Sequence, residues 1–292
     1  MATLRDILRK INAVKRTRQI TRAMNMVAAA KLRNTQGKME SFEPYARKFS
    51  DVLAHLASTL DPEIHPLLIS REEVRRVELL FFTADRGLCG SFNTNSINRA
   101  EEWIKEQEQN GRKVTLFCIG KKGIDYFKKK NIDMTASYTQ LYGRTDMAFI
   151  NRMTGDFINR FLREDIDELY MLYTRFVSML RYEPTVVKLL PITPPSELEQ
   201  ALMKGIEYIY EPDSASLMIE LLPKYISVQI YNAFLQNEVS EHAARMTAMD
   251  NATKNCEDMI ENLTLLYNKA RQASITLELL DIVGGAEAIK KA

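Results

Sequence analysis

The chain has 292 residues, of which 46% are hydrophobic and 27% are charged, and its formal net charge is +2. This composition is typical of a soluble protein with one or two domains, and the small net charge by itself predicts no strongly polyanionic partner. Three widely spaced cysteines argue against a disulfide framework or a zinc site, and no apolar run approaches the roughly 20 residues of a membrane-spanning helix. The charged N-terminus also lacks the apolar region of a signal peptide.

The N-terminal segment, residues 1–60, is predicted to be a long helix with one seam of apolar and small residues. Gly37 and Pro44 interrupt the helical pattern only mildly, and it ends near Leu60. The segment is also basic, because residues 1–33 contain nine lysines and arginines and only one acid, Asp6. The seam recurs at alternating spacings of three and four, at Leu4, Ile7, Ile11, Val14, Arg18, Thr21, Asn25, Ala28 and Leu32.

The middle of the chain, residues 61–212, begins with a proline-containing connector and then alternates between strand and helix patterns. This order predicts a Rossmann-like α/β domain with a mostly parallel sheet. The strand candidates are residues 75–85, 113–120, 168–178, 184–192 and 206–212, and the helix candidates are residues 93–109, 121–130 and 145–162.

The C-terminal segment, residues 213–292, is predicted to be a second long helix. No glycine or proline occurs between Pro223 and Gly284, and at 1.5 Å per residue this stretch of about 60 residues would be roughly 90 Å long. A compact globule of this chain length is only about 50 Å across, so a helix hairpin is favoured over a helix packed on a globule. A heptad seam runs from Tyr225 through Val228, Asn232, Leu235, Val239, His242, Met246, Met249, Thr253, Cys256, Ile260, Leu263, Tyr267, Ala270 and Ser274 to Leu277.

These elements predict an α/β fold plus a long antiparallel two-helix coiled coil formed by the N- and C-terminal helices. In the expected register, Ile11 lies near Ile275 and Phe49 lies near Val239.

The glycine-containing loops of the middle domain do not predict a nucleotide site. Gly87 and Gly90 in "TADRGLCGSFN" (83–93) and the "GKKG" of residues 120–123 match neither the GxGxxG fingerprint nor a phosphate-binding P-loop. A tight turn between strand and helix is the favoured interpretation, with Asp85 and Arg86 paired to hold the first loop.

No catalytic, cofactor-binding or metal-binding residues are predicted. The three histidines, His55, His65 and His242, are isolated in the sequence, and no Ser/His/Asp or Cys/His arrangement is visible. Two alternatives stay open at this point: a nucleotide-dependent α/β enzyme with a coiled-coil appendage, and a basic coiled-coil module that binds nucleic acid. The second is disfavoured because the N-terminal cations lie on several faces without an aromatic residue for base stacking.

Several stretches together resemble the gamma subunit family of bacterial F-type ATP synthases. They are "ITRAMNMVAAAKLR" (20–33), "TADRGLCGSFN" (83–93), "YIYEPD" (208–213), "EHAARMTAMDNATKN" (241–255) and "LYNKARQASITLELLDIVGGAEA" (266–288). The resemblance runs from residue 2 to the C-terminus in the same segment order.

The resemblance implies a central rotor stalk, without catalytic activity or cofactor of its own, that couples ion flow through the membrane c ring to conformational changes in the catalytic beta subunits. The implied partners are the alpha and beta subunits of the catalytic hexamer, the epsilon subunit and the c ring, and not nucleic acid. The chain would be held at the cytoplasmic face of the bacterial plasma membrane only through this complex.

The resemblance also implies roles for individual positions. The residues expected to contact beta subunits are Arg271, Gln272, Arg16, Arg18, Arg22 and Lys31. Those expected in the upper bearing are Ile275, Leu279, Ile282 and Val283, and those expected at the foot on the c ring are Tyr208, Tyr210 and Glu211. The sequence departs from the family at Asn25, where a charged residue is frequent, and at Pro223, where the C-terminal helix is already running.

Overall fold

The computed structural model describes residues 3–59, 65–143, 146–193 and 213–291. The chain forms two compact units, one made of Met1–Ala28 with Met246–Ala292 and the other made of Ala29–Arg245. Two long helices, α1 (Leu4–Thr59) and α6 (Ser214–Lys291), contribute residues to both units. Both helices were predicted, and α1 continues through Gly37 and Pro44 while α6 continues through Pro223.

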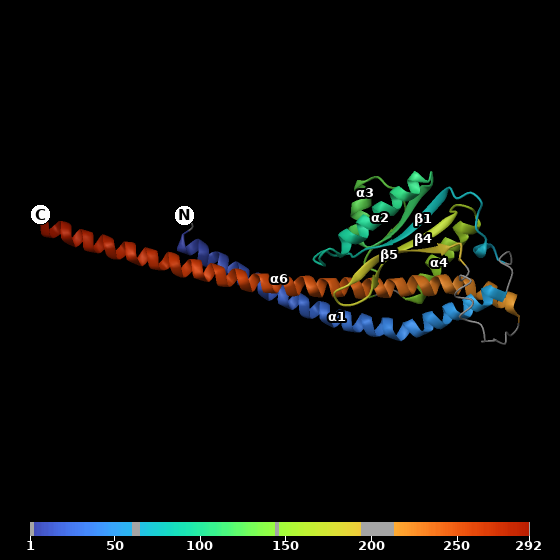
Figure 1. The fold of residues 1–292 in the computed structure, drawn as a ribbon, viewed down its shortest axis with the longest axis horizontal. Helices are drawn as coiled ribbons and strands as arrows, with labels where there is room; N and C mark the ends of the chain where they lie inside the picture. The colour runs from blue at the N-terminus through green and yellow to red at the C-terminus, as the bar shows by residue number, and fades with distance from the viewer. Residues whose placement is uncertain (1–2, 60–64, 144–145, 194–212, 292) are drawn as a thin grey trace. The chain divides into compact units, whose positions relative to one another are not determined.

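The larger unit contains a five-stranded sheet in the order β3-β2-β1-β4-β5 (Figure 1). The first four strands in chain order are parallel and β5 pairs with β4 in the antiparallel sense. The strands are β1 (Arg76–Phe82), β2 (Lys113–Ile119), β3 (Met134–Tyr138), β4 (Glu168–Phe176) and β5 (Tyr182–Leu190). The other elements are the short 3-10 helix η2 (Pro66–Leu68) and the helices α2 (Phe92–Gln109), α3 (Lys121–Lys129) and α4 (Met147–Leu162).

The predicted α/β order is therefore confirmed, with one strand missed. The sequence of β3, MTASY, is largely exposed and lacks the apolar run of a buried strand, which is why its pattern gave no signal. The strand candidate at 206–212 lies outside the described residues.

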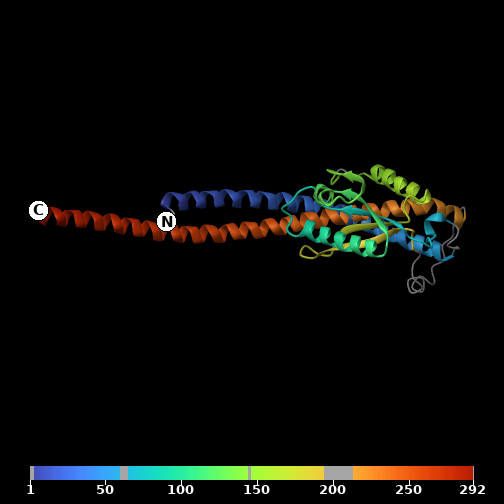
Figure 2. The same ribbon diagram turned by 90° about the horizontal axis from the view of Figure 1, so that it is seen from above.

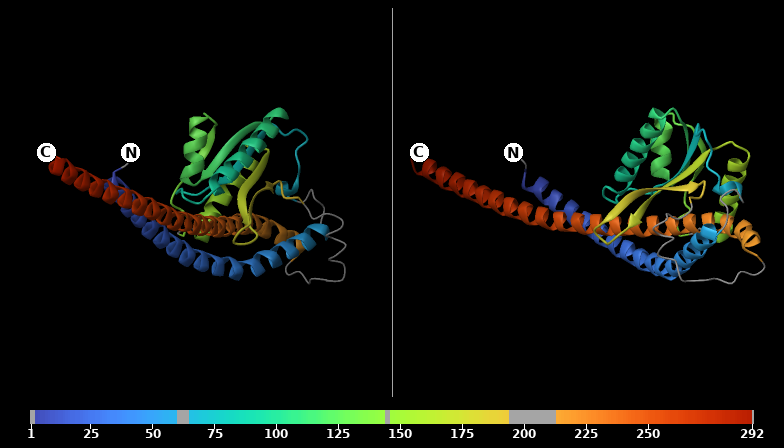
Figure 3. Two further views of the ribbon diagram at one scale, coloured as in Figure 1. Left: turned by 60° about the vertical axis from the view of Figure 1, so that its left-hand side comes forward. Right: turned by 45° about the vertical axis from the view of Figure 1, so that its right-hand side comes forward.

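Alternate side chains of the central strands pack into two apolar cores, one on each face of the sheet. Val77, Leu79 and Phe81 of β1 pack with α2 and α3 on one face of the sheet. Leu80 and Phe82 of β1 pack on the other face with α4, α6 and the last turns of α1 (Figure 3). This period-two division is the expected pattern for a sheet covered on both faces. It makes α6 an integral wall of the larger unit.

In the smaller unit, the N-terminal part of α1 lies antiparallel beside α6 (Figure 2). The hydroxyl oxygens of Thr21 and Thr253 are 2.8 Å apart, and the Asn25 side-chain amide donates to the carbonyl oxygen of Met246 at 2.9 Å. Where the two helices lie side by side, seam residues are the less exposed ones, which confirms the predicted antiparallel coiled coil; the last seam residue of α6, Leu277, is 61% exposed. Asn25 thus serves within the hairpin as a hydrogen-bond donor.

The predicted register of the two helices is wrong. With Thr21 beside Thr253, counting ten residues along each helix puts Ile11 near Leu263, and Ile275 lies 12 residues further along α6. In the larger unit, Ser50 accepts a hydrogen bond from Gln229 at 3.2 Å, so its neighbour Phe49 also lies well before Val239. A seam specifies which face of a helix is buried, but sliding along the seam keeps the same face buried.

Candidate functional site

The strand order of the sheet reverses between β1 and β4, and in open α/β sheets this switch point is where ligands bind. In this chain, side chains of α6 and of the loop after β3 fill the space at the switch point. The Asn237 carboxamide oxygen accepts from the Thr174 N–H at 3.1 Å, and its nitrogen donates to the Tyr142 hydroxyl at 2.8 Å. That hydroxyl donates to the Thr83 carbonyl at 2.8 Å, and Ser240 donates to the Thr174 carbonyl at 3.1 Å. The chain's own polar groups occupy the usual ligand position.

The "GKKG" turn packs closely on the end of β1. A side chain at Gly120, whose φ is +100°, would place its Cβ 1.9 Å from the Thr83 carbonyl oxygen, and a Cβ at Gly123 would lie 2.7 Å from the Phe81 ring. The Gly123 N–H donates to the Thr83 hydroxyl at 2.9 Å. These glycines allow close backbone approach, which confirms the interpretation as a tight βα turn.

The loop after β1 is held differently from the prediction. The Asp85 carboxylate accepts from the backbone N–H groups of Lys121 and Gln140, each at 3.0 Å. No ion pair joins Asp85 to Arg86 in the described part of the chain, so that predicted pair is wrong. The Lys121 N–H in the first turn of α3 has no acceptor within its helix, and the helix dipole favours a negative charge there. Asp85 therefore binds this N–H and not the exposed Arg86 side chain.

The buried cysteines are poor nucleophiles. Burial raises the pKa of the Cys89 thiol and raises the pKa of Cys118 to about 12. Both thiols therefore stay protonated near neutral pH, whereas a catalytic cysteine needs a lowered pKa. Within the ranges that the structure describes, no group of three or more histidine, cysteine or acidic side chains is arranged to hold a metal ion.

The C-terminal end of α6 is an exposed apolar surface. It continues past the N-terminal end of α1 in both views (Figures 1 and 2). The exposed fractions of Ile275, Leu279, Ile282 and Val283 are 44%, 57%, 69% and 57%. Exposed apolar side chains clustered on one element usually mark a surface that contacts another protein. We name residues 271–283 the helix tip.

Arg271 and Gln272 begin the helix tip, and both side chains are exposed. Arg16 and Arg22 are exposed on α1, while Arg18 is half-buried and lies 3.9 Å from Glu257. Lys31 is exposed and belongs to the larger unit. Among the described side chains, Arg16, Arg22, Lys31 and Arg271 make no ion pair within the chain. Tyr208, Tyr210 and Glu211 lie outside the described residues.

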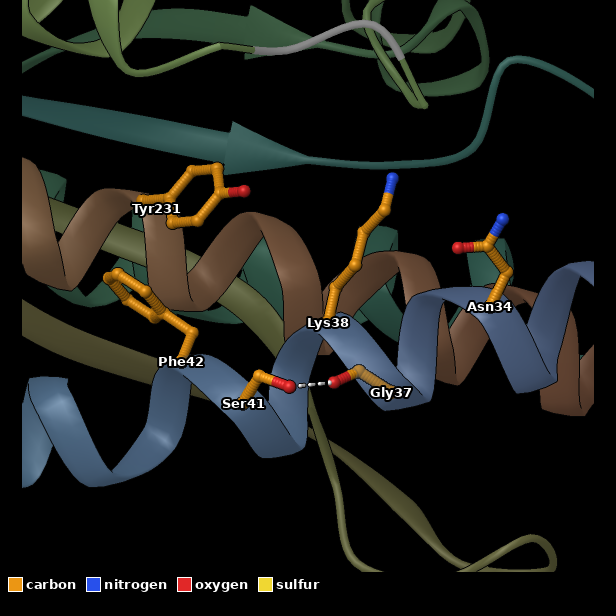
Figure 4. A pocket seen from close by; sticks show the side chains of 6 residues that line it. All are labelled: Asn34, Gly37, Lys38, Ser41, Phe42 and Tyr231. Carbon is orange, nitrogen blue, oxygen red and sulfur yellow. Dashed lines mark hydrogen bonds between the residues drawn. The ribbon is translucent and has the colours of Figure 1, made fainter.

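A shallow groove lies between α1 and α6 in the larger unit (Figure 4). It has a volume of about 550 Å³ and is lined by Asn34, Gly37, Lys38, Ser41, Phe42 and Tyr231. Ser41 donates to the Gly37 carbonyl at 2.8 Å, so its hydroxyl is engaged within its own helix. The groove brings together no acid–base or nucleophilic pair that would point to catalysis.

The fold and these surfaces define a class of α/β protein whose terminal helices form a hairpin ending in an exposed tip. A family model described as ATP synthase matches residues 3–289. The ATP synthase gamma chain of Syntrophobacter fumaroxidans is 50% identical over 292 residues, which cover 100% of both chains. The chain therefore belongs to the ATP synthase gamma chain family.

Two solved structures share the fold at low sequence identity. The first, the rotor of Euglena gracilis mitochondrial ATP synthase in rotational state 1, has a TM-score of 0.65 and 22% identity and covers 93% of this chain and 98% of its own. The second, from the OSCP/F1/c-ring assembly of the same organism in rotational state 3, has a TM-score of 0.68 and 20% identity and covers 98% and 94%. The similarity in fold extends over nearly the whole chain. Among the described residues, no helix is both long and apolar enough to cross a membrane.

Proposed function

We propose that this chain is the central rotor stalk of a bacterial F-type ATP synthase. In this role it couples ion flow through the membrane c ring to conformational changes in the catalytic beta subunits. The observation that carries the proposal is the exposed apolar helix tip on α6, within a chain whose curated relative is an ATP synthase gamma chain over its full length.

The division of labour follows the three segments of the sequence. Residues 1–60 and 213–292 supply the coiled-coil shaft, and residues 61–212 supply the α/β foot domain. Tyr208, Tyr210 and Glu211 would contact the c ring, and the epsilon subunit would bind the foot. The assembly holds the chain as a peripheral protein at the cytoplasmic face of the plasma membrane.

The exposed cations and the helix tip would contact the catalytic hexamer. Arg271 and Gln272 would make hydrogen bonds to one beta subunit, and the exposure of both side chains at the start of the helix tip supports this. The cations Arg16, Arg18, Arg22 and Lys31 would face acidic beta-subunit loops. Each rotor orientation would favour one beta conformation through such differential contacts, which shifts the population of nucleotide-binding states.

The chain itself would hydrolyse nothing. Its α/β sheet has the architecture that often binds nucleotides, but α6 side chains fill the switch point. The buried thiols are protonated, so they do not offer an alternative nucleophile. Catalysis in the complex would therefore belong to its other subunits.

Reconstitution tests the proposal. ATP synthase of the native host is assembled in lipid vesicles with and without this chain, and ATP-driven ion transport is measured. We expect transport only when the chain is present, and no ATP hydrolysis by the purified chain alone. Transport of equal rate without the chain, or turnover by the chain alone, would contradict the proposal.

A further inference from the structure

The hydrogen bonds at the closed switch point have fixed directions. Asn237 is fully buried, and the Thr174 N–H beside it can only donate, so the carboxamide oxygen must face that group. The carboxamide nitrogen therefore donates to the Tyr142 hydroxyl, which has its own proton left to donate to the Thr83 carbonyl. Each of these three bonds therefore has only one possible direction.

Two residues of α6 hold the same point of the sheet. The parallel pairing of β1 with β4 ends at Phe81 and Leu172. Thr174 lies two residues after Leu172 on β4. Its N–H donates to Asn237 and its carbonyl accepts from Ser240. Asn237 and Ser240 are three positions apart, so they lie on one face of α6, and both bonds depend on that face pointing toward β4.

The same strand residue is tied to the opposite layer of the domain. The Thr174 hydroxyl is 3.0 Å from the Ser96 hydroxyl, which donates to the Phe92 carbonyl of α2. Both side chains are buried. The polar chain therefore runs from α6 through β4 to α2 and links both faces of the sheet.

The surrounding apolar contacts cannot fix a rotation angle as sharply. Phe234 of α6 packs edge-on against Phe82 with ring centroids 5.0 Å apart, and its ring is tilted against that of Tyr142 at 5.6 Å. Such burial is non-directional, whereas a hydrogen bond weakens steeply when its donor–hydrogen–acceptor angle falls below about 120°. Buried polar networks that are fully satisfied specify one arrangement among several that bury similar apolar area.

We propose that Asn237 and Tyr142 are positioning residues that lock the rotational angle of α6 against the α/β domain, so that torque passes between them without slip. This inference rests on the proposed rotor function. The lock acts at a joint inside the larger unit, and it needs neither nucleotide nor a partner subunit to form.

A measurement of rotor stiffness tests the lock. A bead is attached to the α/β domain at an introduced Lys129→Cys, an exposed position of α3, in a Cys256→Ser background. The catalytic hexamer of the reconstituted complex is fixed to a surface, and the angular fluctuations of the bead are recorded in nucleotide-arrested pauses. Asn237→Leu removes both carboxamide bonds at similar volume, and Tyr142→Phe removes only the hydroxyl.

The control variant is Ile104→Val, which trims a buried side chain of α2 in the core that faces away from α6. It weakens the domain without touching the polar chain. We expect the variance of the bead angle to rise at least about twofold in Asn237→Leu and by a smaller factor in Tyr142→Phe, with no change in Ile104→Val.

Wild-type variance in both lock variants, or an equal rise in Ile104→Val, would overturn the inference. A wild-type complex whose bead never rotates during ATP hydrolysis would instead overturn the proposed function, and the inference would fall with it. Tyr142→Phe keeps the ring that packs on Phe234, so the test stands even where Asn237→Leu fails to assemble.

Discussion

Asp167 is a buried carboxylate at the N-terminal ends of β1 and β4, and its surroundings stabilise a negative charge. It accepts from the backbone N–H groups of Arg75 and Arg76 at 2.9 and 2.7 Å and forms ion pairs with the guanidinium groups of Arg71 and Arg76. Burial raises the pKa of this carboxyl, but these bonds together outweigh burial and lower the pKa below its ordinary value of 3.8.

This pKa shift predicts an acid-dependent stability. Because the folded-state pKa lies below the unfolded value, the carboxylate stabilises the fold above that value, and the contribution is lost as the pH falls through the folded pKa. We expect Asp167→Asn to cost about 1–3 kcal/mol at pH 7 and to flatten the fall in unfolding free energy below pH 5. Urea unfolding across pH measures both effects.

Asp165→Asn is the matched control for this prediction, because Asp165 is exposed and no ion pair engages it among the described residues. It should leave stability at pH 7 within about 0.5 kcal/mol of wild type. An Asp167→Asn variant that loses stability in acid as steeply as wild type would show that the carboxylate is not responsible.

Arg271 is an exposed residue whose predicted partner is another chain. We expect Arg271→Ala to lower the rate of coupled ATP synthesis about tenfold, equivalent to about 1.4 kcal/mol, because it removes a contact made only in the complex. The melting temperature of the isolated chain should change by less than about 2 °C, as for other surface substitutions.

Lys269→Ala provides the comparison, since Lys269 is also exposed and lies two positions earlier on the same helix. It should leave synthesis near the wild-type rate. If Arg271→Ala instead lowers stability and synthesis in parallel, its role is in the fold of this chain.

Helices and strands were predicted where their pattern lies within one short stretch of sequence, and missed where it does not. The seams of α1 and α6 were predictable because apolar residues recur at the helical period, and the strands β1, β2 and β4 were predictable because each is a short apolar run. The short exposed β3 carried no such repeat. The register of the hairpin was not predictable either, because it depends on contacts between distant residues such as Thr21 and Thr253.

The residues of the candidate site also fall into those that the sequence predicted and those that it missed. Arg271, Gln272 and the helix tip are exposed because, in the register set by Thr21 and Thr253, α1 begins near the position opposite Arg271 and covers nothing beyond it. Their roles rest on the resemblance and stay predictions. The closure of the switch point by Asn237 and Ser240 was missed, because the sequence does not show that α6 packs across the ends of β1 and β4. Asn237 stands between Gln236 and Glu238 in a stretch of mixed polarity, so its carboxamide gave no distinct signal in the sequence.

Two helical glycines differ in the space that surrounds them, so their alanine variants should change stability in opposite directions. A Cβ at Gly37 of α1 meets nothing within 4 Å, so Gly37→Ala should raise the unfolding free energy by about 0.5–1 kcal/mol through helix propensity. Gly123→Ala in α3 should lower it by about 1–3 kcal/mol, because the added carbon lies 2.7 Å from the Phe81 ring. Thermal and urea unfolding of both variants checks the opposite signs.

The hairpin register can be tested by crosslinking. In a Cys256→Ser background, cysteines replacing Thr21 and Thr253 should form an intramolecular disulfide under mild oxidation, because the two hydroxyl oxygens are 2.8 Å apart. Cysteines replacing Ile11 and Ile275 should not, since Ile275 lies roughly 18 Å beyond the expected neighbour of Ile11 along α6. A disulfide in the second pair and none in the first would contradict the register.

At the scale of the whole molecule, the two long helices are the covalent link between the units. α6 supplies one wall of the α/β domain, then the seam partner of α1, and then the exposed helix tip. One continuous helix therefore joins the α/β domain, where the proposed lock lies, to the surface proposed to meet the catalytic hexamer. This continuity is what a part that transmits torque requires.

Rotation of the α/β domain during ATP hydrolysis tests the central claim most directly. With the catalytic hexamer fixed to a surface and a bead attached at Lys129→Cys, we predict unidirectional rotation when ATP is added and arrest when ATP is exhausted. Sustained ATP hydrolysis by the complex while the bead stays at one angle would contradict the account.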